Sequence, residues 1–279
     1  TTYDAGSFIT DSASAGTAIA SGNKTLNGVI NMDTSKTVSF PTIAEMARDQ
    51  GYKIGIVSNV SLDHATPAAF YAKVPTRGNM YDIAVQMGNS GFDYFGGGGL
   101  AQPRGRNNDQ IDALELARQK GYTVVNSVAA FKNLKRGSGK VIAINPTLQD
   151  SFSMPYEMDR GSDDLSLADY VAKGIELLDN EKGFFMMAES GKVDWACHAN
   201  DAAASIHDTL AFDRAIAVAV AFQQKHPNDT LIIVTGDHET GGMSLGFAGT
   251  KYDTFFDKIS AQKGSYVAFN ETVLKPYKA

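Results

Sequence analysis

The sequence predicts an α/β fold with a largely parallel central sheet and helices on both faces, and two observations predict it. First, four short apolar runs have the length and composition of buried strands: KIGIVS (53–58), VIAIN (141–145), FFMMAE (184–189) and LIIVTG (231–236). Second, segments with helical periodicity alternate with them: TIAEMARDQG (42–51), QIDALELARQKG (110–121) and SLADYVAKGIELLDNEKG (166–183). Strands that alternate with helices form parallel sheets, because each crossover helix returns the chain across one face. We therefore expect three layers, α/β/α.

Glycine and small residues mark where individual elements begin and end. In MARDQGYKIGIV (46–57) and LARQKGYTVV (116–125), a helix closes at glycine and a strand restarts soon afterwards. The stretch 12–22 predicts a helix of small residues, and 201–227 predicts a long helix. The stretch FGGGGLAQPRGRNN (95–108) lacks the Lys-Ser/Thr ending of a P-loop, so it is interpreted as a flexible surface connection.

The composition limits the class of protein. With 279 residues and 43% hydrophobic content, the chain can form one large domain, and we take 1–279 as a single domain. The net charge is −6 and the basic residues are scattered, which argues against a nucleic-acid-binding surface. Cys197 is the single cysteine and excludes an internal disulfide. No long apolar run and no basic-then-apolar leader predicts a membrane span or a signal peptide.

Side chains that bind metals gather just after the strand-like runs, where α/β sheets hold their ligands. They are His64 and Thr66 after the first run, Glu189, Asp194 and His198 after the third, and Asp237, His238 and Glu239 after the fourth. Asp194 and His198 stand at i and i+4, so on a helix both face one cation, and carboxylate plus imidazole suits zinc. The neighbouring Asp237 and His238 form a second pair of this kind.

The remaining candidates offer different chemistry. Glu189 with Thr66 and His64 is a harder ligand set, as expected of magnesium or of a mixed site. Arg77 carries a planar fork that can grip two oxygens of a phosphate or sulfate. Ordinary interpretations stay open: each acid–imidazole pair as a solvated turn, Thr66 as a cap, and Arg77 as an exposed charge.

Ser12 follows Asp11 at the start of the first predicted helix. There its oxygen would lie near unpaired backbone N–H groups and the positive end of the helix dipole, which favours an alkoxide and an anionic substrate. A zinc ion bound directly to the hydroxyl would lower its pKa and replace a histidine base. The alternative is that Asp11 or Ser12 serves only as a helix cap.

Four segments together resemble the alkaline phosphatase family. They are TDSASAGTAIASGNKT (10–25), SLDHATPAAFYAKVPTR (61–77), AESGKVDWACHAND (188–201) and VTGDHETGG (234–242). Their order and internal spacings are highly specific, and they extend from Thr10 to Gly242. The resemblance implies the three-layer α/β fold and the hydrolysis of small phosphate monoesters. It also favours a periplasmic or secreted location and a homodimer, since family members are commonly exported and dimeric.

The resemblance also implies roles for individual residues. Ser12 would be the nucleophile that forms a phosphoseryl intermediate. Asp11 would shape its turn and help to position Arg77, which would hold the phosphate oxygens. Asp194 and His198 would bind a first zinc ion, which stabilises the leaving oxygen and then activates water.

The other metal ions have implied ligands too. Asp237 and His238, with Ser12 itself, would bind a second zinc ion that activates the serine. Glu189 and Thr66 would bind magnesium, directly or through its water shell. The implied cofactors are therefore two zinc ions and one magnesium ion.

Some positions depart from the commonest family pattern. His64 and Trp195 stand where some members carry Asp and Lys, and this pairing resembles a branch that includes cold-adapted and marine bacterial enzymes. Because imidazole tolerates zinc where carboxylate prefers magnesium, zinc can replace magnesium as the third ion. Cys197 is interpreted as a packed thiol rather than a zinc ligand, and neither His207 nor His226 is a candidate ligand.

Two features expected of the family are missing from this sequence. No Gly-Asp-Gly-type turn precedes Asp11, and no histidine follows His238. The chain is therefore expected to be an interior portion of a longer enzyme. A catalytically inactive remnant that binds a metal or a partner is the alternative function. A sulfatase or phosphodiesterase is a weaker one, because DSASAGT is not a C/S-x-P-x-R motif.

Overall fold

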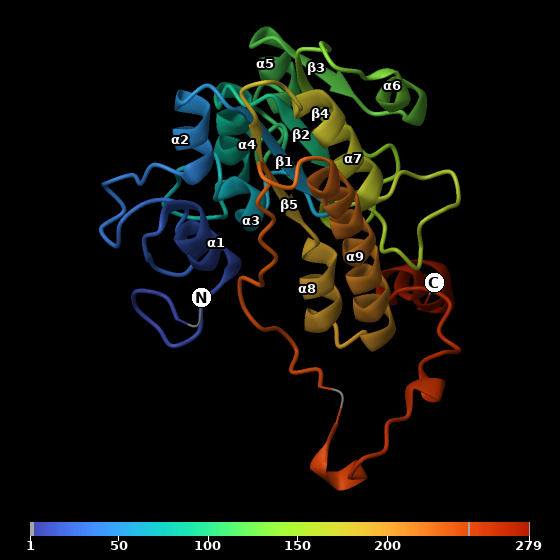
Figure 1. Cartoon of the computed structure of the whole chain (residues 1–279). Helices are drawn as coiled ribbons and strands as arrows, with labels where there is room; N and C mark the ends of the chain where they lie inside the picture. The colour runs from blue at the N-terminus through green and yellow to red at the C-terminus, as the bar shows by residue number, and fades with distance from the viewer. Residues whose placement is uncertain (1–2, 245, 279) are drawn as a thin grey trace.

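A computed structural model describes residues 3–244 and 246–278 of the chain. At its centre is a parallel sheet of five strands in the order β3-β4-β2-β1-β5 (Figure 1). The strands are β1 (Lys53–Ser58), β2 (Tyr94–Gly97), β3 (Tyr122–Val125), β4 (Lys140–Ile144) and β5 (Phe184–Glu189). The predicted parallel sheet is therefore confirmed, together with three of the four apolar runs that were expected to form strands.

Helices cover both faces of the sheet, as predicted (Figure 1). They are α1 (Ser12–Ser21), α2 (Ile43–Asp49), α3 (Ala65–Ala68), α4 (Met80–Asn89), α5 (Ala113–Gln119), α6 (Val128–Asn133), α7 (Leu167–Leu178), α8 (Gly191–His198), α9 (Ala202–Lys225), α10 (Tyr266–Phe269) and α11 (Lys275–Lys278). Successive β1 side chains point to opposite faces. Ile54 and Ile56 join one buried cluster with α2, α4 and α5, whereas Val57 joins another with α7 and α9.

Capping residues and glycines fix where the helices begin and end. Asp11 caps α1, while Thr42 and Ser166 form capping boxes at α2 and α7. Gly51 and Gly121 follow α2 and α5 with φ of 84° and 89°. Glycine adopts this left-handed conformation without strain. The two predicted helix-to-strand transitions at these glycines are confirmed.

The interpretation of 95–108 as a flexible surface connection was wrong for its first part. Tyr94–Gly97 form β2 inside the sheet, and residues 94–100 are buried. Gly97 has φ of 126°, and a Cβ there would lie 1.8 Å from the carbonyl oxygen of Ser58. The close approach of β1 therefore requires glycine. A strand built from glycine lacks the β-branched side chains by which strands are recognised.

The apolar run 231–236 was also predicted as a strand, and this prediction was wrong. It is extended chain outside the sheet, with Leu231, Ile233 and Val234 exposed by 83%, 75% and 58%. Among the described strands, β5 is the last on its side of the sheet. A strand needs a neighbouring edge that supplies hydrogen bonds. The run 231–236 does not pair with the outer edge of β5, and an apolar pattern alone cannot show whether such a pairing forms.

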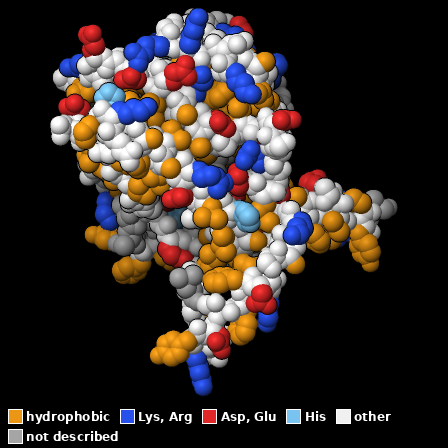
Figure 2. Space-filling view, turned by 45° about the vertical axis from the view of Figure 1, so that its right-hand side comes forward, with side chains coloured by type: hydrophobic (Ala, Val, Ile, Leu, Met, Phe, Trp, Pro, Cys, Tyr) orange, Lys and Arg blue, Asp and Glu red, His pale blue; other side chains and the backbone are white. Residues whose placement is uncertain are grey.

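The last part of the chain projects from the body and then docks against it. Figure 2 shows hydrophobic side chains on this projection, and Phe247 and Tyr252 are among its exposed residues. The backbone N–H of Tyr266 then donates to Asp201 at 2.7 Å, which attaches α10 to the start of α9. Among the helices of residues 3–244 and 246–278, none combines the length and the apolar content that a bilayer crossing requires.

We expect Ile56→Ala to lower the free energy of unfolding by about 2–5 kcal/mol, because Ile56 is fully buried in the sheet. The matched change Ile233→Ala removes the same atoms from an exposed side chain and should cost less than about 0.5 kcal/mol. Urea denaturation of both variants measures the difference. Equal losses would contradict the placement of 231–236 outside the sheet.

Candidate active site

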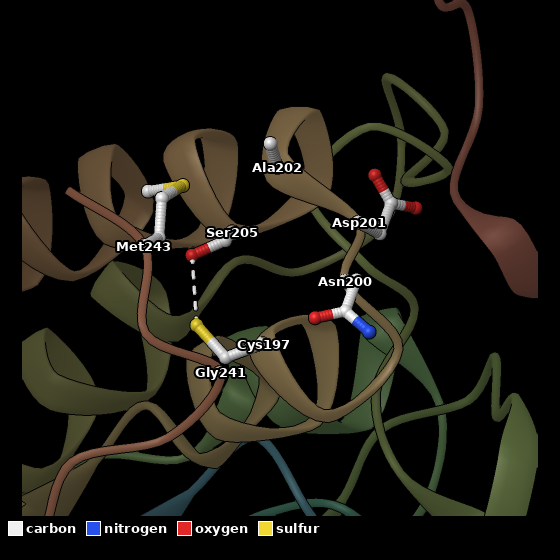
Figure 3. A pocket seen from close by; sticks show the side chains of 7 residues that line it. All are labelled: Cys197, Asn200, Asp201, Ala202, Ser205, Gly241 and Met243. Atoms are coloured by element: carbon white, nitrogen blue, oxygen red, sulfur yellow. Dashed lines mark hydrogen bonds between the residues drawn. The ribbon is translucent and has the colours of Figure 1, made fainter. Parts of the chain in front are cut away.

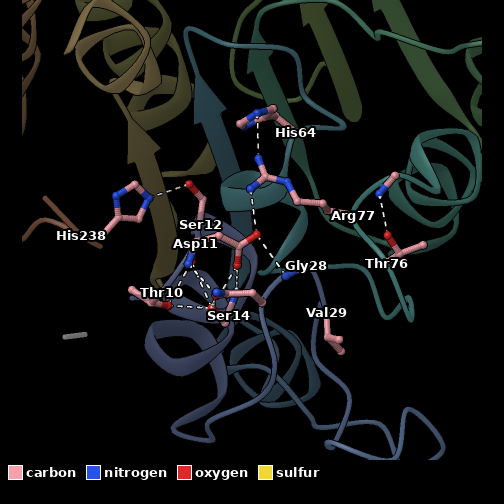
Figure 4. A network of polar contacts seen from close by, with 12 residues as sticks. Thr10, Asp11, Ser12, Ser14, Gly28, Val29, His64, Thr76, Arg77 and His238 are labelled. Carbon is pink, nitrogen blue, oxygen red and sulfur yellow. Dashed lines mark hydrogen bonds and ion pairs between the residues drawn. The ribbon is translucent and has the colours of Figure 1, made fainter. Parts of the chain in front are cut away.

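The candidate site lies at the carboxyl ends of β1 and β5. These strands pair in parallel with Ser58 opposite Glu189, so both end at the same edge of the sheet. Helix α1 approaches this edge by packing against α3. A Cβ on Gly16 of α1 would lie only 2.9 Å from the Cβ of Ala69, next to α3. The amino end of α1, which carries Ser12, is thereby held beside the strand ends (Figure 4).

Asp11 connects the start of α1 to two other segments. Its Oδ1 accepts hydrogen bonds from the backbone N–H and the Oγ of Ser14, both at 3.0 Å. Its Oδ2 accepts from the N–H of Gly28 at 3.1 Å and from Nη1 of Arg77 at 3.0 Å. Burial raises the pKa of Asp11, but these hydrogen bonds and the Arg77 charge outweigh it and hold the pKa below its usual value. Asp11 is therefore an ionised cap that also orients Arg77.

Ser12 and His238 meet although they are far apart in the sequence. Ser12 is 7% exposed, and its Oγ lies 2.9 Å from Nε2 of His238 (Figure 4). The same Nε2 is 3.3 Å from Oδ2 of Asp237. On the other side of the ring, Nδ1 lies 3.2 Å from Oγ1 of Thr240, and this hydroxyl donates to Oδ1 of Asp194 at 2.6 Å. These contacts join α1, the turn that carries His238, and α8.

The contacts of His238 fix which ring nitrogen carries the proton. The hydroxyl of Thr240 uses its hydrogen on Asp194, so it accepts from Nδ1 of His238. Nδ1 therefore carries a proton, and Nε2 faces Oγ of Ser12 and Oδ2 of Asp237. An imidazole whose Nδ1 is hydrogen-bonded in this way, with Nε2 facing the centre, has the arrangement of a metal ligand.

Arg77 and His64 form the opposite side of the site. Nη2 of Arg77 lies 3.1 Å from Nε2 of His64, so the guanidinium sits between Asp11 and the imidazole (Figure 4). Burial and the Arg77 charge lower the pKa of His64 to about 3, despite the opposing charge of Asp11, so the ring is neutral. Because a guanidinium only donates, Nε2 accepts and Nδ1 carries the proton. Nδ1 is buried without a hydrogen-bond partner in the described residues.

The contact between His64 and Arg77 affects the metal-binding role expected of His64. Its accepting nitrogen, Nε2, is occupied by Arg77, so His64 can bind a cation through Nε2 only after it leaves the guanidinium. The structure thus places His64 beside the centre but engages it with the predicted phosphate-binding arginine.

Glu189 ends β5 and faces the segment that follows β1. Its carboxylate accepts hydrogen bonds from Oγ of Ser58, at 2.5 Å, and from Thr66. Burial raises the pKa of Glu189 to about 7, the hydroxyls of Ser58 and Thr66 oppose this shift, and the charges of Asp237 and Asp194 add to it. Three carboxyl groups thus repel one another in one region, and a divalent cation would relieve that repulsion.

Asp194 and His198 share one face of α8, as their spacing predicted. Nε2 of His198 lies 3.5 Å from Oδ1 of Asp194, and the imidazole is 69% exposed. Within the part of the chain that the structure describes, no three His, Cys, Asp or Glu side chains converge closely enough to hold a metal ion. The predicted ligands therefore meet in pairs that hydroxyl groups connect.

Ser58 and Thr240 are site residues that sequence reasoning missed. Ser58 is the last residue of β1, and a polar side chain at the carboxyl end of a buried strand is a signal that could have identified it. Thr240 lies within the 234–242 segment that the resemblance had already selected. Its position two residues after His238 gave no indication of its contact with α8.

Cys197 and the remaining histidines lie outside the candidate site. Sγ of Cys197 is 3.2 Å from Oγ of Ser205, and both line a cavity of about 200 Å³ where α8 meets α9 (Figure 3). The thiol packs there, as expected. His207 belongs to α9, and His226, at its end, packs against Phe222 with ring centroids 4.5 Å apart and the rings tilted by 33°.

A serine at a helix amino end, an oriented arginine and acid–imidazole pairs, all at one edge of a parallel sheet, are typical of α/β proteins that bind phosphorylated ligands. The family model for alkaline phosphatase matches residues 1–271. The chain therefore belongs to the alkaline phosphatase family.

Individual relatives agree with this assignment. Alkaline phosphatase 4 of Bacillus subtilis is 36% identical over 251 residues, which cover 87% of this chain and 52% of the relative. The structure of the cold-active alkaline phosphatase from a psychrophilic Shewanella superposes with a TM-score of 0.78 at 34% identity, covering 89% of this chain and 59% of that one. The Thermus thermophilus alkaline phosphatase gives 0.82 at 29% identity, covering 95% and 56%. The chain thus spans a little over half the length of these relatives.

We expect the metal-free chain to lose stability as pH rises from about 4.5 to about 7. The pKa of Glu189 is raised from 4.5 to about 7 on folding, so its contribution to stability is fully present below 4.5 and is lost as pH rises through 7. Glu189→Gln removes this titration. The difference in melting temperature, variant minus wild type, should therefore grow over that range in EDTA.

Asp208, whose pKa is also raised to about 7, titrates in both proteins and cancels in the difference. Added zinc and magnesium should reduce the difference, because a bound cation favours the ionised carboxylate. A difference that stays constant with pH in EDTA would contradict the charge repulsion at Glu189.

Proposed function

We propose that this chain carries the active centre of a metal-dependent phosphomonoesterase in which Ser12 is the nucleophile. The observation that carries the proposal is the 2.9 Å contact between Oγ of Ser12 and Nε2 of His238. A hydroxyl in this position can give up its proton as it attacks, and the amino end of α1 favours the negative charge. The orientation of Arg77 by Asp11 and the family assignment support the same reaction.

The reaction has two steps. In the first, Oγ of Ser12 loses its proton to solvent and attacks phosphorus, the bond from phosphorus to the ester oxygen breaks, and that oxygen takes up a proton and leaves as an alcohol. In the second, water attacks the phosphoserine and loses a proton, the bond from phosphorus to Oγ breaks, Oγ takes up a proton again, and phosphate leaves. In both steps Arg77 donates hydrogen bonds to the non-bridging oxygens, and Asp11 holds the plane of its guanidinium.

The metal ligands are proposed from the family resemblance. We assign Asp194 and His198 to one zinc ion, Asp237 and His238 with Ser12 to a second, and Glu189, Thr66 and His64 to magnesium or a third zinc. When bound, the ions would stabilise charge on the attacking and leaving oxygens. Two solved variants of the TAB5 alkaline phosphatase carry magnesium in the site called M3, which supports magnesium use in the family.

The wider setting of the chain is proposed from the family. Small phosphate monoesters would be its substrates, a periplasmic or extracellular location its place of action, and a homodimer its assembly. We take 1–279 as a single alkaline phosphatase-like domain, which spans a little over half the length of the relatives.

A catalytically inactive protein that binds a metal or a partner is the second candidate. The observation that favours it is that no three His, Cys, Asp or Glu side chains of the described residues converge on one point. Zinc binding without turnover would select this candidate. A sulfatase or phosphodiesterase activity has less support, because DSASAGT at 11–17 lacks the motif that sulfatases modify.

Replacing Ser12 tests the proposed nucleophile. With zinc and magnesium present, Ser12→Ala should lower kcat for p-nitrophenyl phosphate by more than about a thousandfold, because no other group forms the phosphoenzyme. Acid quenching and mass spectrometry should find a phosphoryl group on Ser12 of the wild-type chain. Ser21→Ala at the far end of α1 is the matched control and should retain activity, since that hydroxyl contacts only the local backbone. Equal activity of the two variants would overturn the assignment.

Replacing Arg77 tests the proposed phosphate grip. Arg77→Ala should raise the inhibition constant of inorganic phosphate about 10- to 100-fold, because charge-assisted hydrogen bonds are lost. Arg136→Ala is the control, since Arg136 pairs with Asp179 at the surface. An unchanged inhibition constant in Arg77→Ala would remove Arg77 from the site.

A further inference from the structure

A cavity of about 340 Å³ adjoins the candidate centre, and the reaction described above does not use it. His64 forms part of its lining, together with Ala101, the polar side chains of Ser61, Gln102 and Ser151, and three large apolar side chains. They are Trp195 on α8, Met80 at the start of α4, and Phe152 in the segment after β4. Ligand cavities in proteins have volumes of about 300–1,000 Å³ and mostly apolar walls.

The cavity is connected to the centre by contacts that run from Asp11, next to Ser12, through Arg77 to His64. One nitrogen of the Arg77 guanidinium holds Asp11, next to Ser12, and the other holds His64, which lines the cavity (Figure 4). In phosphoryl transfer the leaving oxygen lies opposite the attacking oxygen. An ester held by Arg77 above Ser12 therefore directs its organic group away from Ser12, and the cavity begins at His64, which contacts Arg77.

The walls of the cavity are fixed by a buried lysine. Lys192 on α8 is completely buried, and its Nζ contacts Oδ1 of Asp150 at 2.6 Å and Oγ of Ser153 at 2.8 Å. These two residues flank Phe152. The same Nζ lies 5.1 Å from the ring centre of Trp195. One ammonium group thus holds two walls of the cavity in a constant relation.

Phe152 occupies an unusual backbone conformation at this position. Its φ is 60°, which is uncommon for a bulky residue. Its carbonyl oxygen accepts from the N–H of Gly99 at 2.8 Å, and its side chain remains 48% exposed. The segment therefore keeps an aromatic side chain at the cavity rather than burying it in the core.

We propose that this cavity binds the organic group of the substrate and that it favours a flat, ring-bearing alcohol over a small polar one. The proposal rests on the proposed phosphomonoesterase function and specifies its substrate class. The described lining residues contribute no carboxylate, and an aromatic ring gains contact area from Trp195, Met80 and Phe152.

Substrate selectivity tests the cavity. Phe152→Ala and Met80→Ala should each lower kcat/KM for naphthyl phosphate about tenfold, the scale expected for lost apolar contact. Neither should lower kcat/KM for glycerol phosphate more than about twofold. Phe256→Ala, with a similar exposure of 49% in the projecting segment, is the matched control and should alter neither value. Equal losses on both substrates, or none on naphthyl phosphate, would overturn the proposal.

A binding measurement separates this proposal from the proposed function. Trp195 is the single tryptophan of the chain and lines the cavity, so all tryptophan emission comes from this position. With zinc and magnesium present, benzylphosphonate, which is not hydrolysed, should produce a saturable change in emission. Phe152→Ala should weaken its binding about tenfold while leaving methylphosphonate binding unchanged.

The two measurements distinguish a failure of the proposed function from a failure of the cavity proposal. A chain that binds benzylphosphonate in this manner but hydrolyses no ester would refute the proposed function and retain the binding cavity. A chain that hydrolyses esters normally, with no emission change and no altered selectivity in the variants, would refute the cavity proposal alone.

Discussion

The carboxylate of Asp11 is the group on which the candidate centre depends. It caps α1 and accepts hydrogen bonds from Ser14, Gly28 and Arg77. A partly buried carboxylate costs free energy unless donors replace its lost water, and these donors do so, because they hold its pKa below the usual value. The same side chain begins the helix that carries Ser12 and orients the guanidinium opposite it. The proposed nucleophile and the proposed anion grip therefore share one reference point, and a shift of this turn would move both.

The register of the parallel sheet then concentrates acidic groups beside that point. Ser58 and Glu189 are paired at the ends of β1 and β5, and their side chains are hydrogen-bonded as well. Asp194 and Asp237 come from the segments that follow, and their charges help to raise the pKa of Glu189 to about 7. Repulsion of this kind costs stability when no cation is present and contributes affinity when one is. The carboxylates at the strand ends therefore lower the stability of the metal-free fold and raise its affinity for a cation.

Sequence reasoning predicted the elements whose signals are local and missed those set by a neighbour. Periodicity, caps and helix-ending glycines identified α1, α2, α5, α7, α9 and every described strand except β2, whereas no prediction covered the shorter helices α3, α6, α10 and α11 or the ten-residue α4. That strand escaped because the need for Gly97 arises from the adjacent strand β1. The run 231–236 failed for the complementary reason, since its residues suit a strand but the run does not pair with the outer edge of β5. The same distinction holds in the site: residue type and position after a strand selected the candidates, whereas the contact of Thr240 with Asp194 depends on three-dimensional placement.

His238 reaches its position without the support of a sheet ladder. The chain that leads to it is exposed and extended, so the contact of His238 with Ser12 and that of Thr240 with Asp194 attach this turn to α1 and α8. Gly241 adds a close approach, because a Cβ there would lie 2.6 Å from the carbonyl oxygen of Cys197. A segment attached by few contacts opens at a lower free energy than a core strand. Any ligand that binds Ser12 and His238 together therefore also stabilises the attached turn, and by linkage a change that loosens the turn weakens that ligand. Local order and ligand affinity are thus properties of the same small set of contacts.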